Sequence, residues 1–290
     1  MSQSSSSTQT RWQAPIVLLL LSMVSIHSGA AIAKSLFGQV SPLGLVSLRL
    51  GLGALVMVLF ARPRWRHYAW RDYRLFGLLG LSMGVMNALF YNAIAYIPIS
   101  VGVTLEFVGP LGVALIYSRR NWDLLWVALA AAGIILLAPV GGFSLHPLGA
   151  LLALLAGGCW AAYIILAAQA SKVAPGSEGV AIAAIFGTIV ILPFGIAVEG
   201  GNLFAPSVLV PGLAVGILSS ALPYALEMAA LRHLSVKVFG VLMSLEPAMA
   251  SCLGLLILGE KPSPRILGAI AFVSIASAGS TLKTFIDKQS

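Results

Sequence analysis

The stretch Val101–Arg120, reading VGVTLEFVGPLGVALIYSRR, decides how the rest of the chain is interpreted. It is apolar over a length that crosses a bilayer as a helix, and it ends in a pair of arginines. Near its middle lie Glu106 and the helix-disturbing pair Gly109-Pro110. A carboxylate at bilayer depth is costly unless it has a partner or reaches water, and a proline there frees a backbone carbonyl. The stretch therefore predicts a membrane helix with a functional site near its centre.

The composition of the whole chain is that of a membrane protein. Of its 290 residues, 59% are hydrophobic and 9% are charged, whereas soluble domains carry about 25% charged residues. The formal charge of +8 comes from basic residues dispersed over short segments between apolar runs. This pattern orients membrane proteins and does not indicate nucleic-acid binding. We therefore expect a lipid bilayer around the chain and no nucleic-acid partner.

Ten apolar runs of about 20 residues follow one another with short links. They are 14–37, 42–61, 74–96, 99–118, 123–140, 147–170, 178–198, 208–231, 235–258 and 264–284. We expect an all-α membrane protein with ten transmembrane helices, preceded by a disordered cytoplasmic segment at residues 1–13. Cys159 and Cys252 lie inside the apolar runs, so they are expected to be reduced packing residues.

The basic residues orient these spans. With a cytoplasmic N-terminus, thirteen of the 17 Lys and Arg residues fall on the cytoplasmic side. Two fall outside, and Lys34 and Arg49 fall within spans. This asymmetry follows the positive-inside rule and predicts that both termini are cytoplasmic.

The ten spans divide into two sets of five, at residues 14–140 and 147–284. Because each set holds an odd number of spans, the second set must be inverted relative to the first. Sliding the sequence by 137 residues places Pro110 on Pro247, and a rival slide of 140 places TLE (104–106) on SLE (244–246). We prefer the first because it aligns two helices without a gap. Inverted repeats with proline-interrupted helices are typical of secondary transporters, whose site lies at the midplane.

Few ionisable groups lie within the spans, and the carboxylates among them are candidates for binding a proton or an ammonium group. Glu106 and Arg49 either face a central cavity or form a structural ion pair that fixes helix packing. Glu246 directly precedes Pro247 and suits reversible protonation during a transport cycle. Glu227 lies closer to the cytoplasmic end, where it lines the path or a helix interface.

Other polar and aromatic side chains within the spans have a functional and a structural interpretation. His27 is either a packing residue or a ligand for substrate or proton. Lys34 either snorkels outward or attracts a carboxylate. An amide such as Asn87 binds a polar ligand or bridges helices. Aromatic rings either pack or form a wall for an ammonium group through cation–π attraction, and the candidates are Tyr91, Trp160, Tyr163 and Tyr224.

The sequence contains no Walker A, HExxH, GxSxG or dinucleotide-binding motif. We therefore expect no ATP-driven or hydrolytic chemistry, no cofactor and no metal site, so that transport uses an ion gradient or the substrate gradient.

An intramembrane enzyme would depend on His27 and Ser28, but adjacent helix positions point about 100° apart. A passive channel fits less well, because buried carboxylates beside prolines suit a closing cycle.

Seven segments carry a resemblance to known transporters. They are GAAIAKSLF (29–37), LEFVGPLGVAL (105–115), SRR (118–120), GGCWAAYI (157–164), ALPYALEMAAL (221–231), FGVLMSLEPAMA (239–250) and LGEK (258–261). With the ten spans, they resemble the EamA family of drug/metabolite transporters, and within it the bacterial threonine/homoserine exporters. The resemblance covers residues 14 to 283 and departs at His27, where it implies glutamine.

The resemblance implies efflux of homoserine and threonine across the bacterial inner membrane in exchange for protons. Export of other metabolites or drugs is the alternative, and either a monomer or a homodimer is compatible with the sequence. A zwitterionic amino acid needs a cation for its carboxylate and an acid or aromatic face for its ammonium group. Candidates for these roles are Arg49, Lys34, Glu106, Glu246, Trp160 and Tyr163. We expect Glu106 or Glu246 to alternate between proton and ammonium group, which would produce antiport.

Overall fold

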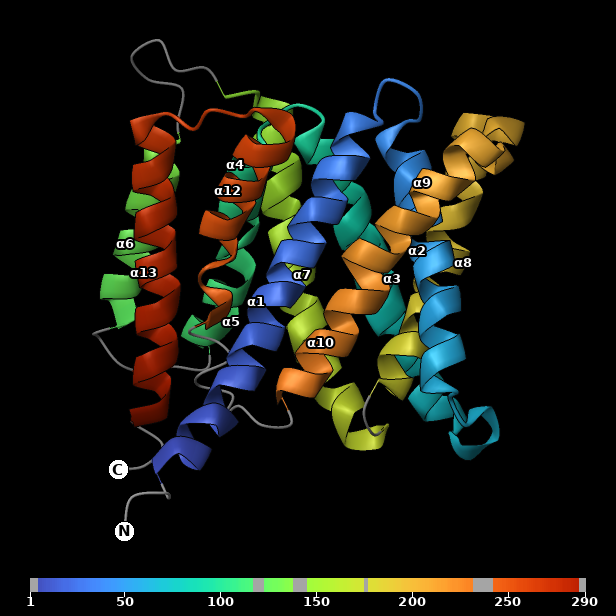
Figure 1. Cartoon of the computed structure of the whole chain (residues 1–290), viewed down its shortest axis with the longest axis horizontal. Coiled ribbons are helices and arrows are strands. Elements are labelled where there is room, and N and C mark those ends of the chain that lie inside the picture. The colour runs from blue at the N-terminus through green and yellow to red at the C-terminus, as the bar shows by residue number, and fades with distance from the viewer. Residues whose placement is uncertain (1–4, 117–122, 138–144, 175–176, 232–241, 287–290) are drawn as a thin grey trace.

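The chain folds into a bundle of helices that run side by side through the molecule (Figure 1). The computed structural model describes residues 5–116, 123–137, 145–174, 177–231 and 242–286, and every regular element in these ranges is helical. Within the described ranges, six helical segments are long and apolar enough to cross a membrane. They are Pro15–Ser35, Pro42–Ala61, Trp70–Ile94, Pro147–Val173, Glu178–Phe204 and Pro206–Glu227. The expected helical membrane protein is thus confirmed.

The elements follow one another along the chain with short links. The first half contains α1 (Ser5–Ser35), α2 (Pro42–Ala61), a 3₁₀ turn η1 (Trp65–His67), α3 (Trp70–Ile94), α4 (Ile99–Glu106), α5 (Val108–Ile116) and α6 (Asp123–Leu136). The second half contains α7 (Pro147–Val173), α8 (Glu178–Glu199), a 3₁₀ turn η2 (Gly200–Phe204), α9 (Pro206–Gly216), a π-helical segment η3 (Ile217–Ala221), α10 (Leu222–Leu231), α12 (Glu246–Leu258) and α13 (Pro264–Ile286).

Helix α1 starts at Ser5, inside the segment 1–13 that was expected to be disordered. The difference has a simple physical origin, because extending an existing helix is far easier than nucleating a new one. The start of α1 and the end of α13 lie at the same end of the bundle (Figure 1).

The fourth expected span is broken at Phe107 into α4 and α5. Pro110 explains the position of the break, because a proline ring clashes with the carbonyl four residues earlier, here that of Glu106. The freed end of α4 rests against α7, where a Cβ placed on Gly157 would lie 2.6 Å from the Glu106 carbonyl oxygen. The break thus places the carboxylate-bearing residue at a helix end, packed backbone to backbone on α7.

A second break lies just before Glu246. Residues Ser244 and Leu245 form a turn, and α12 begins at Glu246 with Pro247 in its first turn. Proline is favoured there because the N–H groups of a first turn have no partner within the helix. Glu106 and Glu246 are therefore both residues at a helix end.

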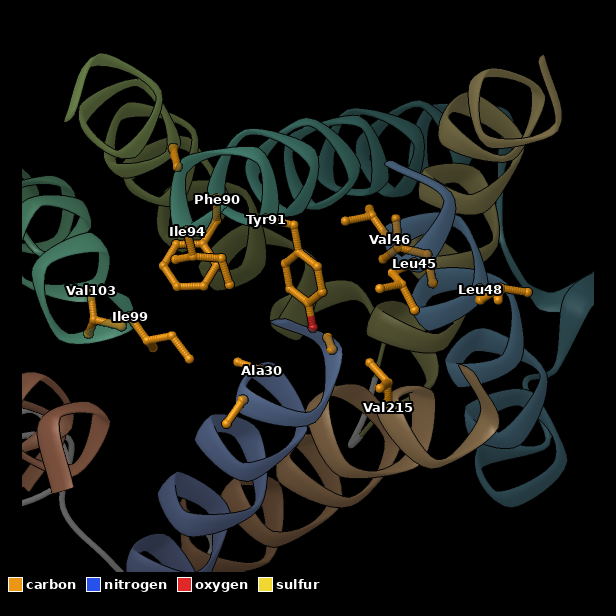
Figure 2. Packing of buried hydrophobic residues seen from close by; sticks show 14 of the residues in the cluster. Ala30, Leu45, Val46, Leu48, Phe90, Tyr91, Ile94, Ile99, Val103 and Val215 are labelled. Atoms are coloured by element: carbon orange, nitrogen blue, oxygen red, sulfur yellow. The ribbon is translucent and has the colours of Figure 1, made fainter. Parts of the chain in front are cut away.

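The core is held by close contacts between helices. Gly80 and Gly84 of α3 face Ala183 and Gly187 of α8, where added Cβ atoms would meet backbone atoms of the partner helix. These small residues let the backbones of α3 and α8 approach closely. Figure 2 shows the main apolar cluster, in which Tyr91 reaches from α3 into the space between α1 and α2.

Candidate functional site

Arg49 is a cation buried between helices. It extends from α2 with 5% of its surface exposed. Its Nη2 donates to the Ser219 carbonyl oxygen at 2.7 Å, and its Nε donates to Ser220 Oγ at 3.3 Å. The guanidinium carbon lies 5.2 Å from the centre of the Tyr91 ring, within cation–π range. A buried guanidinium held by neutral groups keeps its charge available to an anion.

The acceptors of Arg49 belong to the π-helical segment η3. Pro223 lacks an N–H group, so the Ser219 carbonyl four residues earlier is free to accept from Arg49. The neighbouring Leu218 carbonyl accepts from Ser25 Oγ of α1 at 2.7 Å. Such π segments are frequent at functional sites.

Glycines of α1 and α2 allow η3 to approach. A Cβ on Gly29 would collide with Ser219, and one on Gly53 would lie 2.9 Å from the Ser220 Cβ. Sequence reasoning missed η3, although Pro223 preceded by Ser219-Ser220 was a readable signal for freed carbonyls.

Two polar atoms beside Arg49 have no hydrogen-bond partner in the described part of the chain. They are His27 Nε2 and the Tyr91 hydroxyl, and both are buried. His27 lies within electrostatic range of Arg49. Buried polar groups nearly always have partners, so two orphaned groups next to one cation indicate that a ligand or water completes the arrangement.

Three carboxylates complete the set of ionisable groups near Arg49. Glu106 and Glu246 are 8% and 7% exposed, and Glu227 on α10 accepts from Ser22 Oγ at 2.8 Å. Glu246 lies within electrostatic range of both Glu106 and Glu227. The structure thus brings together, from α4, α10 and α12, the three glutamates selected from the sequence.

Two tyrosines lie near the glutamates, and one of them also lies near Arg49. Tyr163 of α7 hydrogen-bonds with Tyr224 of α10, and Tyr224 interacts with the charges of Arg49, Glu106 and Glu227. Trp160 does not share this position, because its ring packs edge-on against Phe107 at the α4–α5 break, with centroids 5.1 Å apart.

The expected alternative of an Arg49–Glu106 ion pair is not formed: within the described ranges no contact of 4 Å or less joins their charged atoms. Their charges interact at longer range. Asn87 uses its amide within its own helix, donating to the Met83 carbonyl at 2.8 Å. In the described residues no cluster of His, Cys, Asp and Glu resembles a metal site.

Lys34 lies apart from the central groups and is already paired. Its Nζ is 2.7 Å from Glu260 Oε1 and donates to the Ile97 carbonyl at 2.8 Å. Glu260 also accepts from the Ile99 N–H at the start of α4. This junction joins α1, α4 and the end of α12. Sequence reasoning missed Glu260, although it lies in the quoted LGEK segment.

The fold and the central charges define a class of membrane transporter, and the sequence comparisons agree. The profile of the EamA-like transporter family matches residues 147–282. The chain belongs to this family and is a multi-pass membrane protein.

Among its relatives, the threonine/homoserine exporters RhtA of Escherichia coli (strain K12) and Salmonella typhimurium (strain LT2) are 46% identical over 271 residues. The match covers 92% of this chain and 91% of theirs. The uncharacterized transporter YwfM of Bacillus subtilis is 25% identical over 250 residues, covering 81% of this chain and 82% of that protein. A solved crystal structure with 20% identity covers 96% of this chain with a TM-score of 0.65, which supports the fold alone.

Proposed function

We propose that the protein exports small neutral amino acids, homoserine and threonine, across the bacterial inner membrane. The observation that carries the proposal is the gathering of opposite charges inside the bundle, where buried Arg49, Glu106 and Glu246 and half-buried Glu227 lie within electrostatic range of one another through Glu106 and Glu246. The names of the 46%-identical relatives supply the substrate class.

An amino acid at neutral pH fits this gathering of opposite charges. Its carboxylate would bind Arg49, because a guanidinium recognises carboxylates with two parallel hydrogen bonds. His27 Nε2 and the Tyr91 hydroxyl, which lack partners among the described residues, would complete the cradle for that end. The ammonium group would face the glutamates, with Tyr163 and Tyr224 beside it.

Proton coupling would follow from competition at the same carboxylates. In this mechanism Glu106 or Glu246 holds either a proton or the substrate ammonium group, but not both. Glu246 lies within electrostatic range of Glu106 and Glu227, and this favours the uptake of a proton when the substrate leaves, because like charges in a low-dielectric site repel. The position of Glu106 and Glu246 at helix breaks lets a small change in helix direction move them between the two sides.

The proposal includes ten membrane spans in two inverted repeats, at residues 14–140 and 147–284, with both termini cytoplasmic. Reciprocal packing supports it. If the halves correspond in order, α3 against α7 matches α1 against α10, and α3 against α8 matches α2 against α9. The pairs α2–α8, α4–α12 and α6–α13 each join corresponding helices. Such exchange is expected of a molecule with a pseudo-twofold axis in the membrane plane.

The decisive experiment is uptake of radiolabelled homoserine into proteoliposomes with and without an imposed pH gradient. The proposal predicts protein-dependent uptake that an acidic interior accelerates. Uptake that is indifferent to pH would support the substrate and contradict the coupling. No uptake above empty vesicles, with folded protein, would contradict the substrate, and alanine, a nucleoside and a cationic dye would then be tested in turn.

Arg49→Gln provides the matching test of the site. It removes the charge and the paired donors, so homoserine uptake should fall by at least tenfold, as expected when a buried charged contact of roughly 1.5–3 kcal/mol is lost. Lys172→Gln, which removes an exposed cation at the end of α7, should leave uptake within about twofold. Equal uptake by both variants would remove Arg49 from the site.

A further inference from the structure

The link between α2 and α3 forms a surface that the transport mechanism does not use. It lies at the same end of the bundle as the described ends of α1 and α13 (Figure 1). We call six exposed side chains of this link and of the start of α3 the basic–aromatic surface: Arg62, Trp65, Arg66, Trp70, Arg71 and Arg74. Trp70 is 74% exposed and Trp65 is 43% exposed.

The backbone behind this surface is held in place. Glu178 at the start of α8 accepts from the Tyr68 hydroxyl at 2.8 Å and from the Arg64 Nη2 and backbone N–H, each at 3.2 Å. Burial, with the Glu178 carboxylate nearby, raises the pKa of Tyr68, so the phenol remains a donor. The Tyr73 hydroxyl donates to the Trp65 carbonyl at 2.6 Å. The exposed side chains therefore project from a fixed frame.

The nearby acidic groups are already engaged. Glu178 is taken by Arg64 and Tyr68, and Asp72 accepts from the Ala69 N–H at 2.9 Å to cap α3. In the described ranges no ion pair joins a carboxylate to any of the four arginines of the basic–aromatic surface. Four guanidinium groups within thirteen residues of chain thus lack a protein counter-ion among the described residues.

Arg62 adds an independent sign of function. It ends α2 in the left-handed conformation, with φ 45° and ψ 59°. Among the described residues other than glycine, it alone has a positive φ. Glycine is the usual residue at such a position because it adopts this conformation without strain. Backbone strain that persists at an arginine on an exposed link points to a role for its side chain.

We propose that the basic–aromatic surface binds the headgroups of anionic phospholipids in the adjacent leaflet. Arginine matches the planar, bidentate geometry of a phosphate diester. Tryptophan prefers the interface between headgroups and acyl chains, and exposed Trp65 and Trp70 flank the arginines along the chain. Clustered basic residues beside a membrane helix attract anionic lipids. The proposal does not depend on the transported substrate.

The test uses the full chain purified in a neutral detergent, with cardiolipin, phosphatidylglycerol or phosphatidylcholine added and lipid binding followed by native mass spectrometry. The wild-type protein should retain the anionic lipids and not phosphatidylcholine. Arg71→Gln with Arg74→Gln, which leaves three arginines in the link, should weaken retention of cardiolipin at least severalfold. The control is Lys261→Gln, which removes an exposed cation from the link between α12 and α13 and should leave retention within about twofold.

Two further measurements keep the proposal falsifiable. Arg71→Lys with Arg74→Lys retains charge but not the planar fork, so retention should lie between that of the wild type and that of the Gln variant. Inorganic phosphate should compete poorly, because it lacks the acyl chains that contact Trp65 and Trp70. Equal retention by the Gln variant and its control, or complete competition by inorganic phosphate, would overturn the lipid site.

Discussion

At the residue scale, Glu106 and Glu246 share two properties: each lies at a helix end, and they are within electrostatic range of each other. Glu106 is the last residue of α4 and Glu246 is the first of α12, and both are buried. At these positions each carboxylate is attached to a helix end whose direction can change. Glu106 interacts with the charge of Arg49, and Glu246 with those of Glu106 and Glu227. A proton or ammonium group bound there is therefore coupled to backbone geometry.

We expect Glu246→Gln to abolish the effect of a pH gradient on homoserine uptake while homoserine–homoserine counterflow persists. The physical reason is that the amide cannot exchange a proton but retains the shape and a hydrogen-bonding group. Acid-interior stimulation, severalfold in the wild type, should fall to about one in the variant. The measurement is proteoliposome uptake with and without the gradient.

Glu106→Gln should be measured in parallel, because either Glu106 or Glu246 could carry the exchanged proton. At least one of the two variants must lose the response to pH. Full pH-driven exchange in both would refute competition between proton and substrate at these residues, and counterflow would then show whether either still contributes to binding.

At the element scale, the α4–α5 break depends on glycine at its contact with α7. A Cβ on Gly109 would collide with the Gly157 carbonyl, and one on Gly157 would meet the Glu106 carbonyl. These neighbours are backbone atoms and cannot rotate away, so only separation of the helices would relieve the contact.

Gly157→Ala is therefore expected to lower the free energy of unfolding by about 1–3 kcal/mol. Gly158→Ala is the matched control, because it lies one residue along the same helix and has no neighbour within 4 Å of an added Cβ. Since alanine favours a helix by about 1 kcal/mol over glycine, the control should be neutral or slightly stabilising. Thermal unfolding in detergent measures both variants, and equal melting temperatures would contradict the close contact.

The Lys34–Glu260 junction gives a second prediction at this scale. Glu260 serves both Lys34 and the Ile99 N–H, so Glu260→Ala should cost more stability than Lys34→Ala. The two substitutions together should cost less than the sum of the single ones, with a coupling on the order of 1 kcal/mol for a partly buried pair. A double-mutant cycle of unfolding measures the coupling, and additive effects would show that the ion pair contributes nothing.

Elements also show how far sequence reasoning reaches. Pro110 and Pro247 were sufficient to predict interrupted helices at the site, because a missing N–H and a ring clash act locally. The three glutamates were identified because carboxylates are rare within apolar spans. The partner of Lys34 was not, since Glu260 lies 226 residues away and only the packing of α1, α4 and α12 brings it close.

The segment η3 could be predicted only in part from the sequence. Pro223 predicts a carbonyl without its helical partner at Ser219. The sequence does not predict that Arg49, 170 residues earlier, donates a hydrogen bond to it. Side-chain pairings between distant helices follow from the packing of the whole bundle, which single-sequence periodicity does not determine.

At the scale of the whole molecule, α2 and α8 form a pair fastened at both ends. At one end Glu178 holds Tyr68 and Arg64 in the link that follows α2. At the other end Glu199 accepts from the Ser41 N–H at 2.6 Å, where Ser41 caps α2. By contrast, α4 and α12 meet at the site and are both bounded by helix breaks. We expect α2–α8 to remain a fixed frame while the broken helices change direction.

The proposed topology makes a direct prediction about which links face which side of the membrane. In a variant lacking Cys159 and Cys252, single cysteines would replace Gly38 or Gly201 in links at one end of the bundle. Others would replace Arg66 or Ser171 near the opposite end. All four positions are exposed, and an added Cβ on either glycine meets nothing within 4 Å. The variants should therefore fold normally and react with a maleimide once accessible.

A membrane-impermeant maleimide applied to intact cells should label the cysteines at 38 and 201 and leave those at 66 and 171 unlabelled until the membrane is permeabilised. The reason is that the arginine-rich link after α2 is retained on the cytoplasmic side. The opposite pattern would invert the orientation while keeping the fold. Labelling of one position from each pair in intact cells would contradict the assignment of both links to a common side, and with it the inverted arrangement of the two repeats.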